Sequence, residues 1–335
     1  MRVFLTGGTG YFGQRLVAGL IGAGHAVTAL VRSRTRALPL ETLGADLVVG
    51  DVTDFAAVKA DLVSYDAFIH SAALVKTRAA DPSEFDRVNV NGVANVARRC
   101  LEARILRFIY TSSFIALGPA SGRVPLDEHA EHDPGHIHND YERTKYLGLL
   151  EYEHWLSRGL PGVALFPCVI YGPGTLTSGN LTASIIADLV LGRLPGVLGD
   201  GQSTWTYSFV EDVVEGHIQA LAKARPGERY ILGGESLSMD EFVALVAQVA
   251  SVRAPRRHIP FALAKVAAFI EETLATIRRR EPKLTRQVVE IYKHNWVYSS
   301  AKAKRELGYT VTPLKTALAQ TVDWVKMAVS EGKIK

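Results

Sequence analysis

Residues 1–13 read MRVFLTGGTGYFG, and this stretch decides the fold. Residues 3–5 form a short apolar run that is typical of a buried parallel strand. Gly7, Gly10 and Gly13 follow, and an amphipathic stretch begins directly after them. Glycines let a backbone turn sharply and approach a pyrophosphate, while the N-terminus of the following helix offers it free N–H groups. The stretch therefore predicts a nucleotide-binding loop between a strand and a helix.

Further apolar runs predict more strands of the same sheet, separated by helical patterns that include a long helix at 82–102. The sequence thus predicts an α/β fold, a Rossmann-type doubly wound parallel sheet with a smaller C-terminal α+β substrate-binding part. Residues 1–174 are assigned to the nucleotide-binding domain, completed by segments near 205–232, and residues 175–335 mainly to the substrate-binding part. The later strands are predicted at 26–31, 47–49, 67–70, 108–110 and 162–166, and the later helices at 181–191, 213–222, 240–250, 263–279 and 316–327.

A polar trio follows the strand at 108–110. Tyr141 and Lys145 lie four residues apart, so on a helix they share one face, and Ser113 comes from the end of the strand. A free tyrosine has a pKa near ~10, and a nearby ammonium lowers it. Lys145 is placed to do this for Tyr141, while Ser113 or its neighbour Ser112 hydrogen-bonds a substrate oxygen. The pair alone also fits a surface aromatic beside a solvated lysine; after a glycine loop it suggests proton transfer.

The composition excludes several classes of function. The chain has 335 residues, 47% hydrophobic residues and a net charge of +4, without a basic stripe interleaved with aromatics, so no nucleic-acid partner is expected. Cys100 and Cys168 form no metal-like pair and favour a reducing compartment. No apolar run approaches the ~20 residues of a membrane helix. A strand that starts near residue 3 leaves no room for a signal peptide, so we expect a cytoplasmic protein without integral membrane association.

The residues after the second strand bear on cofactor choice. An acidic residue there would accept a hydrogen bond from a ribose 2′-hydroxyl, whereas arginine accommodates a 2′-phosphate. The chain has no acid at this place and reads Arg32-Ser-Arg-Thr-Arg36. The pattern favours NADP over NAD, with a solvated charged loop as the alternative.

Six motifs follow one another along the chain: Thr6-Gly-Gly-Thr-Gly-Tyr-Phe-Gly13, Gly50-Asp-Val52, His70-Ser-Ala-Ala73, Tyr110-Thr-Ser-Ser113, Tyr141-x-x-x-Lys145 and Pro167-Cys-Val-Ile-Tyr-Gly-Pro-Gly174. Together they resemble the extended short-chain dehydrogenase/reductase family of the NAD-dependent epimerase/dehydratase superfamily. Within it the sequence is most similar to the dihydroflavonol-4-reductase-like branch, which also resembles 3β-hydroxysteroid dehydrogenases.

The resemblance implies catalytic roles for three residues. Tyr141 is expected to be the general acid in reduction and the base in oxidation, with Lys145 also holding the nicotinamide ribose and Ser113 polarising the carbonyl. Arg32 is expected at the 2′-phosphate, Asp51 and Val52 at the adenine, and the backbone after Phe166 at the nicotinamide carboxamide. The implied cofactor contacts are Gly7, Thr9, Gly10, Tyr11, Phe12, Gly13, Arg32, Asp51, Val52, Ser71, Ala72, Ala73, Tyr141, Lys145, Pro167 and Val169; no metal is expected.

Two departures from the family pattern bear on the substrate. Trp205 stands about where sugar-nucleotide epimerases carry an arginine that pairs with the substrate diphosphate, and Gly118 replaces the Asn or Asp that reads flavonoid hydroxyls. Trp205, Tyr207, Phe114 and Leu117 suit an apolar or aromatic small molecule, or else are core residues. The sequence predicts an NADP-preferring oxidoreductase that interconverts a ketone or aldehyde and an alcohol. An NAD-dependent sugar-nucleotide epimerase and a non-catalytic NADP-sensing protein are the alternatives.

Three features stay open. The loop before Tyr141 carries four histidines among carboxylates. One of these histidines contacts the substrate, or the loop is a mobile lid. A metal site is a further alternative that fits their spacing less well. Asn89 or Asn91 joins a proton relay or hydrogen-bonds a loop. The helix at 261–280 ends in three arginines and either packs on the domain or makes peripheral contact with an anionic membrane. The histidines are His129, His132, His136 and His138.

The family resemblance implies a homodimer through the two long helices, with a monomer as the alternative.

Overall fold

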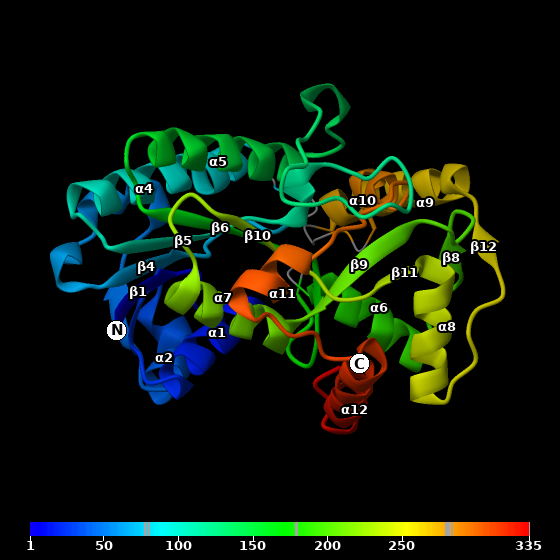
Figure 1. Cartoon of the computed structure of the whole chain (residues 1–335). Coiled ribbons are helices and arrows are strands. Elements are labelled where there is room, and N and C mark those ends of the chain that lie inside the picture. The colour runs from blue at the N-terminus through cyan, green and yellow to red at the C-terminus, as the bar shows by residue number, and fades with distance from the viewer. Residues whose placement is uncertain (77–78, 80, 178–179, 279–281, 283, 335) are drawn as a thin grey trace.

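The central layer is a parallel sheet of seven strands in the order β10-β6-β5-β4-β1-β2-β3 (Figure 1). The structure is a computed structural model. It describes residues 1–335 except 77–78, 80, 178–179, 279–281, 283 and 335. The predicted doubly wound Rossmann-type sheet is confirmed. Its strands are β1 (Arg2–Thr6), β2 (Ala26–Val31), β3 (Asp46–Val49), β4 (Ala67–His70), β5 (Arg107–Thr111), β6 (Gly162–Pro167) and β10 (Arg229–Leu232).

Helices cover both faces of this sheet (Figure 1). One layer holds α3 (Ser83–Asp86), α4 (Gly92–Glu102) and α5 (Asp140–Ser157), and the other holds α1 (Tyr11–Gly22), α2 (Arg34–Thr42), α7 (Val210–Lys223) and α11 (Ala301–Leu307). Alternate residues of a strand point to opposite faces, so Phe4 joins the core under α4 while Val3 and Leu5 join the core under α1. Phe4, Phe68 and Phe108 stack in register across three strands, with ring centroids 5.2 and 5.8 Å apart.

The predicted long helix at 82–102 is divided into three pieces. A π-helical turn, η3 (Arg87–Asn91), separates α3 from α4. The buried side chain of Asn89 lies in this turn, where it accepts a hydrogen bond from the Leu74 N–H at 2.7 Å and donates one to Thr144 Oγ1 at 3.0 Å. Asn89 thus hydrogen-bonds a loop, one of its two predicted roles. A single π-helical turn is a short and rare feature, and helical periodicity alone did not reveal it.

A smaller part lies beyond the carboxyl edge of the sheet, at the right of Figure 1. A three-stranded sheet is formed by β7 (Val169–Tyr171), β9 (Thr204–Phe209) and β11 (Ser236–Ser238), and β8 (Val197–Leu198) pairs with β12 (His258–Ile259). Its helices are α6 (Leu181–Val190), α8 (Met239–Ala250), α9 (Phe261–Ile277), α10 (Arg286–Ile291) and α12 (Leu314–Ser330). The sequence did not predict α2, α10 or α11. Short 3₁₀ turns are η1 (Val52–Ala57), η2 (Leu62–Ser64), η4 (Phe114–Leu117) and η5 (Pro134–His136).

Within the part of the chain that the structure describes, no helix is both long and apolar enough to cross a membrane.

Candidate active site

One cavity of about 950 Å³ runs along the carboxyl edge of the sheet. Strand ends of the first half of the chain form one side, and β9 and α10 contribute to the other. Every residue that the sequence predicted as catalytic or cofactor-binding lines this cavity, and the structure therefore brings all of them together. They are Gly7, Thr9, Gly10, Tyr11, Phe12, Gly13, Arg32, Asp51, Val52, Ser71, Ala72, Ala73, Ser113, Tyr141, Lys145, Pro167 and Val169; their individual roles remain predictions.

The glycine loop between β1 and α1 leaves no space for side chains. Gly7 has a φ of +83°, and a Cβ added there would lie 2.7 Å from backbone atoms of Ser71 and Ala72. A Cβ at Gly13 would lie 2.0 Å from the carbonyl oxygen of Gly7. Helix α1 begins after Gly10 without a side-chain cap and without an acidic residue in its first turn. This cradle of bare backbone and uncapped N–H groups fits the pyrophosphate of a dinucleotide.

The residues that follow β2 and β3 have different surroundings. Arg32 is exposed and lines the cavity, whereas its neighbour Arg34 pairs with Glu41 within α2. Asp51 accepts hydrogen bonds from the backbone N–H and the hydroxyl of Thr53, each at 2.9 Å. Arg32 is thus exposed and makes no ion pair with another described residue, while the Asp51 carboxylate also caps the 3₁₀ turn η1.

The predicted trio meets at the start of α5. Asn139 caps this helix by accepting a hydrogen bond from the Glu142 N–H at 2.8 Å, which holds Tyr141 in the first turn. Ser113 follows β5 and caps the turn η4. Burial raises the pKa of Tyr141 to about 12, and a hydrogen bond with Ser113 offsets part of this increase. The phenol is therefore protonated at neutral pH.

The structure gives Lys145 contacts of its own, and its predicted effect on the pKa of Tyr141 stays a prediction. Its amino group donates to the carbonyl oxygen of Thr111 at 3.2 Å and lies 5.5 Å from the ring centre of Tyr110, so it is directed toward β5. Burial lowers the pKa of Lys145 to about 7, so a substantial fraction of the amine is neutral near pH 7. For Tyr141 the effect of burial dominates, and an electrostatic contribution of Lys145 is not among the causes of its shift.

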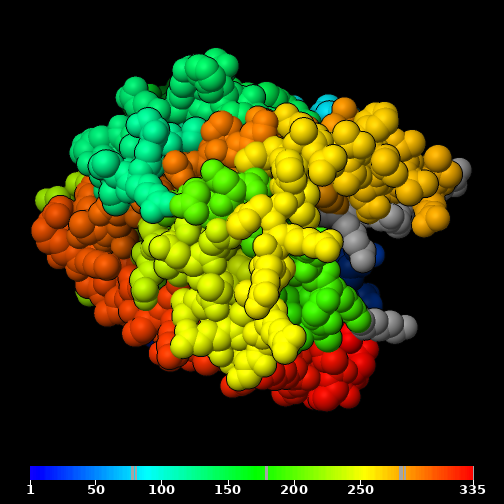
Figure 2. Space-filling view, turned by 90° about the vertical axis from the view of Figure 1, so that its right-hand side faces the viewer, coloured from blue at the N-terminus to red at the C-terminus, as the bar shows by residue number. Residues whose placement is uncertain are grey.

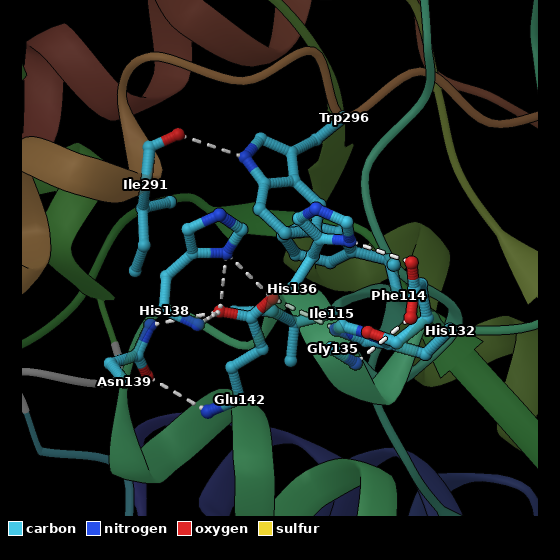
Figure 3. A network of polar contacts seen from close by, with 12 residues as sticks. Phe114, Ile115, His132, Gly135, His136, His138, Asn139, Glu142, Ile291 and Trp296 are labelled. Atoms are coloured by element: carbon cyan, nitrogen blue, oxygen red, sulfur yellow. Dashed lines mark hydrogen bonds and ion pairs between the residues drawn. The ribbon is translucent and has the colours of Figure 1, made fainter.

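A buried carboxylate beside Tyr141 gathers part of the histidine-rich loop (Figure 3). Glu142 Oε1 lies 2.8 Å from His132 Nε2 and 3.1 Å from His138 Nδ1. Burial raises the pKa of Glu142, but hydrogen bonds with these two histidines outweigh it and hold the pKa below its usual value. His132 and His138 therefore serve to fix the loop over the start of α5.

None of the four histidines is among the residues that line the cavity, so the structure does not support the predicted substrate contact. His136 is instead exposed and lies 2.6 Å from Asp133 Oδ2. Across the described residues, no group of three or more His, Cys, Asp or Glu side chains is arranged to hold a metal ion.

Comparison with known proteins decides the family. Residues 3–233 match the model of the NAD dependent epimerase/dehydratase family. The chain belongs to this family. As the motifs predicted, it is an NAD(P)-dependent oxidoreductase of the extended short-chain dehydrogenase/reductase type. It is 30% identical to a putative dihydroflavonol 4-reductase of Synechocystis sp., over 96% of this chain and 93% of the relative.

Two further relatives cover most of the chain. A ketoreductase of Stigmatella aurantiaca, which acts on 4-hydroxy-2-methyl-3-oxo-4-farnesyl-3,4-dihydroquinoline-1-oxide by its name, is 30% identical over 92% of both chains. The crystal structure of gox2253 superimposes with a TM-score of 0.84 at 30% identity, covering 100% of this chain and 99% of the other.

In this member of the epimerase/dehydratase family, the far side of the cavity is largely apolar. Trp205 from β9 packs against Tyr292, with ring centroids 4.5 Å apart, and both line the cavity with Phe114. The short helix α10 adds residues that sequence reasoning missed, because a six-residue helix carries too little periodicity to be recognised. These are Gln287, Val288 and Ile291.

Two of the aromatic and apolar residues predicted to suit the substrate are core residues instead. Tyr207 stacks on Phe242 with ring centroids 4.1 Å apart, and Leu117 is buried in the turn η4. Neither is among the lining residues. Trp205 and Phe114, from the same strand and the same turn, do line the cavity.

Proposed function

We propose that the chain is an NADP-preferring oxidoreductase that interconverts a ketone or aldehyde and an alcohol on a small, fairly apolar substrate. The observation that carries this proposal is a single cavity that joins a bare backbone cradle, a Ser-Tyr-Lys trio and an aromatic wall. The cradle fits the cofactor, and the wall formed by Trp205 and Tyr292 fits an apolar substrate body. The trio lies between them.

The nicotinamide cofactor supplies the hydride when it is bound. The chain's own part is to orient the carbonyl and to provide a proton. Ser113 is positioned to donate a hydrogen bond to the substrate oxygen, and Tyr141 to protonate that oxygen as negative charge develops. Because the pKa of Tyr141 is about 12, its phenol is in the proton-donating form at neutral pH. This protonation state suits carbonyl reduction better than alcohol oxidation.

Two observations support NADP and a substrate without a diphosphate. The described chain offers Arg32 but no acid directly after β2, as a 2′-phosphate requires. Among the described lining residues, the arginines are Arg15 and Arg32 alone, and both come from the glycine-loop half. Arg15 is engaged by Glu211 and by the Pro173 carbonyl oxygen. A sugar-nucleotide epimerase would need an arginine beside Trp205 to bind the substrate diphosphate, and the described cavity lining provides none there.

A non-catalytic NADP sensor remains the second alternative. A sensor needs the cradle but has no use for a protonated tyrosine within reach of a serine hydroxyl. The presence of Ser113 and Tyr141 together at one wall favours an enzyme over a sensor.

The deciding experiment has two steps. Purified protein is first denatured, and any nucleotide that it releases is identified. Fresh protein is then titrated with NADPH and with NADH. The same protein is assayed for oxidation of NADPH in the presence of aryl and alicyclic ketones. We expect exchangeable binding that favours NADPH, and turnover of at least one ketone. Tightly retained NAD together with interconversion of UDP-sugars would overturn the proposal in favour of the epimerase. Binding of NADPH without turnover of any carbonyl or alcohol would favour the sensor.

A further inference from the structure

The helix α9 presents its large apolar residues to the outside. It buries Ala264, Ala268, Ala275 and Glu272, which are mostly small. Its exposed apolar side chains are between 38% and 72% exposed, and they account for six of the sixteen large hydrophobic residues exposed in the described chain. This is the reverse of an ordinary surface helix, whose large apolar residues face the core. The six are Leu263, Val266, Phe269, Ile270, Leu274 and Ile277.

These side chains form one stripe. Leu263, Val266, Ile270, Leu274 and Ile277 are spaced by three or four residues, so they lie on one side of the helix over its whole length. Of the charged residues of α9, Glu272 is buried, and Lys265 and Glu271 are half-buried. A contiguous apolar patch of this kind indicates a surface that binds something.

Two of the three charged residues of α9 pair with residues of the neighbouring helix α10. Lys265 pairs with Glu290 at 2.6 Å, and Glu272 pairs with Arg286 at 2.8 Å. Both partners belong to α10, whose Val289 packs on the buried alanines. These ion pairs and the packing of the alanines fix the orientation of α9, so the apolar stripe faces away from the protein.

Exposed arginines precede and follow α9 in the chain. Arg253, Arg256 and Arg257 lie in the loop before β12, and Arg278 follows the last turn of α9. None of these four makes an ion pair with another described residue. Figure 2 shows this loop, in yellow, and α9, in gold at the upper right, on one side of the molecule. Arg279 and Arg280, which extend the predicted basic end, lie outside the described residues.

We propose that α9 is a docking surface for an anionic lipid bilayer. An outward apolar stripe with flanking arginines matches a helix that lies in the interface, with its side chains among the acyl chains and its cations at the headgroups. A second copy of the chain fits less well. A two-fold interface is self-complementary, so antiparallel pairing of the stripes would set Arg256 and Arg257 against Arg278 of the other copy. The helix was predicted to pack on the domain, and in the structure it does so mainly through its buried alanines.

The docking surface adjoins the cavity but does not rest on the proposed activity. Helix α10 packs against α9 and lines the cavity through Val288 and Ile291. Docking through α9 would bring this apolar wall close to the lipid.

Vesicle co-sedimentation of the full chain tests the proposal. Vesicles of phosphatidylcholine alone are compared with vesicles that contain about 30% phosphatidylglycerol. We expect the protein to pellet with the anionic vesicles, and to bind them less as salt is raised. In Val266→Ser/Ile270→Ser/Ile277→Ser, affinity should fall about tenfold or more, because three apolar side chains no longer enter the membrane.

A matched triple variant controls for general loss of surface hydrophobicity. Val63, Leu106 and Val124 are 71% to 79% exposed and belong to segments of the chain outside α9. Changing all three to Ser should alter vesicle affinity by less than twofold. A second variant, Arg256→Glu/Arg257→Glu, leaves the helix intact and should weaken binding to anionic vesicles.

Three outcomes would overturn the proposal. The first is a wild-type protein that stays in the supernatant with anionic vesicles. The second is an equal loss of affinity in the two triple variants with unchanged melting temperatures. The third is a wild-type dimer in analytical ultracentrifugation that the α9 variant converts to a monomer, since the stripe would then be covered by a second copy.

Discussion

The two ends of the cavity are built in opposite ways. At the end formed by β1 and α1, the wall is backbone, and added Cβ atoms at Gly7 and Gly13 would overlap neighbouring backbone atoms. At the other end the wall consists of large side chains, such as Trp205 and Tyr292, which are 87 residues apart in the numbering and meet only in the fold. The backbone end is a local motif in which Gly7 and Gly13 leave no room for a Cβ. The side-chain end is assembled from distant segments and can change with the substrate.

The sharpest test of the comparison is at the junction of the two ends. Tyr141→Phe removes the proton donor and leaves the cavity shape almost unchanged, so turnover should fall by about 10³-fold. NADPH affinity, measured by fluorescence titration, should stay within twofold. Tyr146→Phe is the control on the same helix, because Tyr146 packs on His132 outside the cavity. Activity retained by the Tyr141 variant would show that another group donates the proton.

The backbone end should be intolerant of a single methyl group. Gly13→Ala would set a Cβ 2.0 Å from the Gly7 carbonyl oxygen, and the loop would have to move. We expect NADPH affinity to fall by about a hundredfold, measured by isothermal titration, because such a shift misplaces the N–H groups at the helix N-terminus. Gly22→Ala in the same helix is the control, since its Cβ would meet nothing within 4 Å. Equal affinities in the two variants would contradict a tightly packed cradle.

Cofactor choice tests whether a single side chain matters at the backbone end. Arg32→Asp should shift the ratio of NADPH to NADH affinity toward NADH by about tenfold or more, because a cation is replaced by a carboxylate at the 2′-position. Arg36→Asp is the matched control, because Arg36 is exposed and lies outside the cavity lining. The same shift in both variants would indicate a general charge effect rather than a phosphate site.

The side-chain end should affect the substrate and spare the cofactor. Trp205→Ala should lower kcat/KM for an aryl ketone roughly fivefold, because the substrate loses an apolar surface to pack on. NADPH affinity should change by less than twofold. Trp155→Ala, on the outer part of α5, controls for the loss of an indole elsewhere. A larger change in cofactor affinity than in kcat/KM would mean that the two ends are not separate.

The smallest effect expected is on stability. The pKa of Lys145 is about 7 in the fold, below its ordinary 10.5 in the unfolded chain. Between these values the unfolded chain binds more protons, so the free energy of unfolding increases with pH, by about 2 kcal/mol between pH 7 and 9. Without cofactor, the melting temperature should therefore rise over this window. Lys145→Met should flatten the dependence; an unchanged slope would assign it to other groups.

Much of the fold could be predicted because its signals are local. The strand at residues 3–5, the glycine spacing and the Tyr141–Lys145 interval each reflect constraints within a few residues. The histidine-rich loop was different. The loop histidines looked like candidates for a substrate or metal contact, but His132 reaches Glu142, ten residues away, through the fold. The effect of Lys145 on Tyr141 stays a prediction, since spacing gives proximity and cannot give burial or direction.

By itself the sequence determined the sheet, the backbone cradle and the identity of the trio, because glycine requirements and the strand and helix periods act over short distances. Only the tertiary structure decided which side chains form the aromatic wall of the cavity, because α10 and β9 are separated by many residues. It also decided that α9 turns its alanines inward and its large apolar residues outward. An amphipathic pattern places residues on a face, but close packing decides which face is buried.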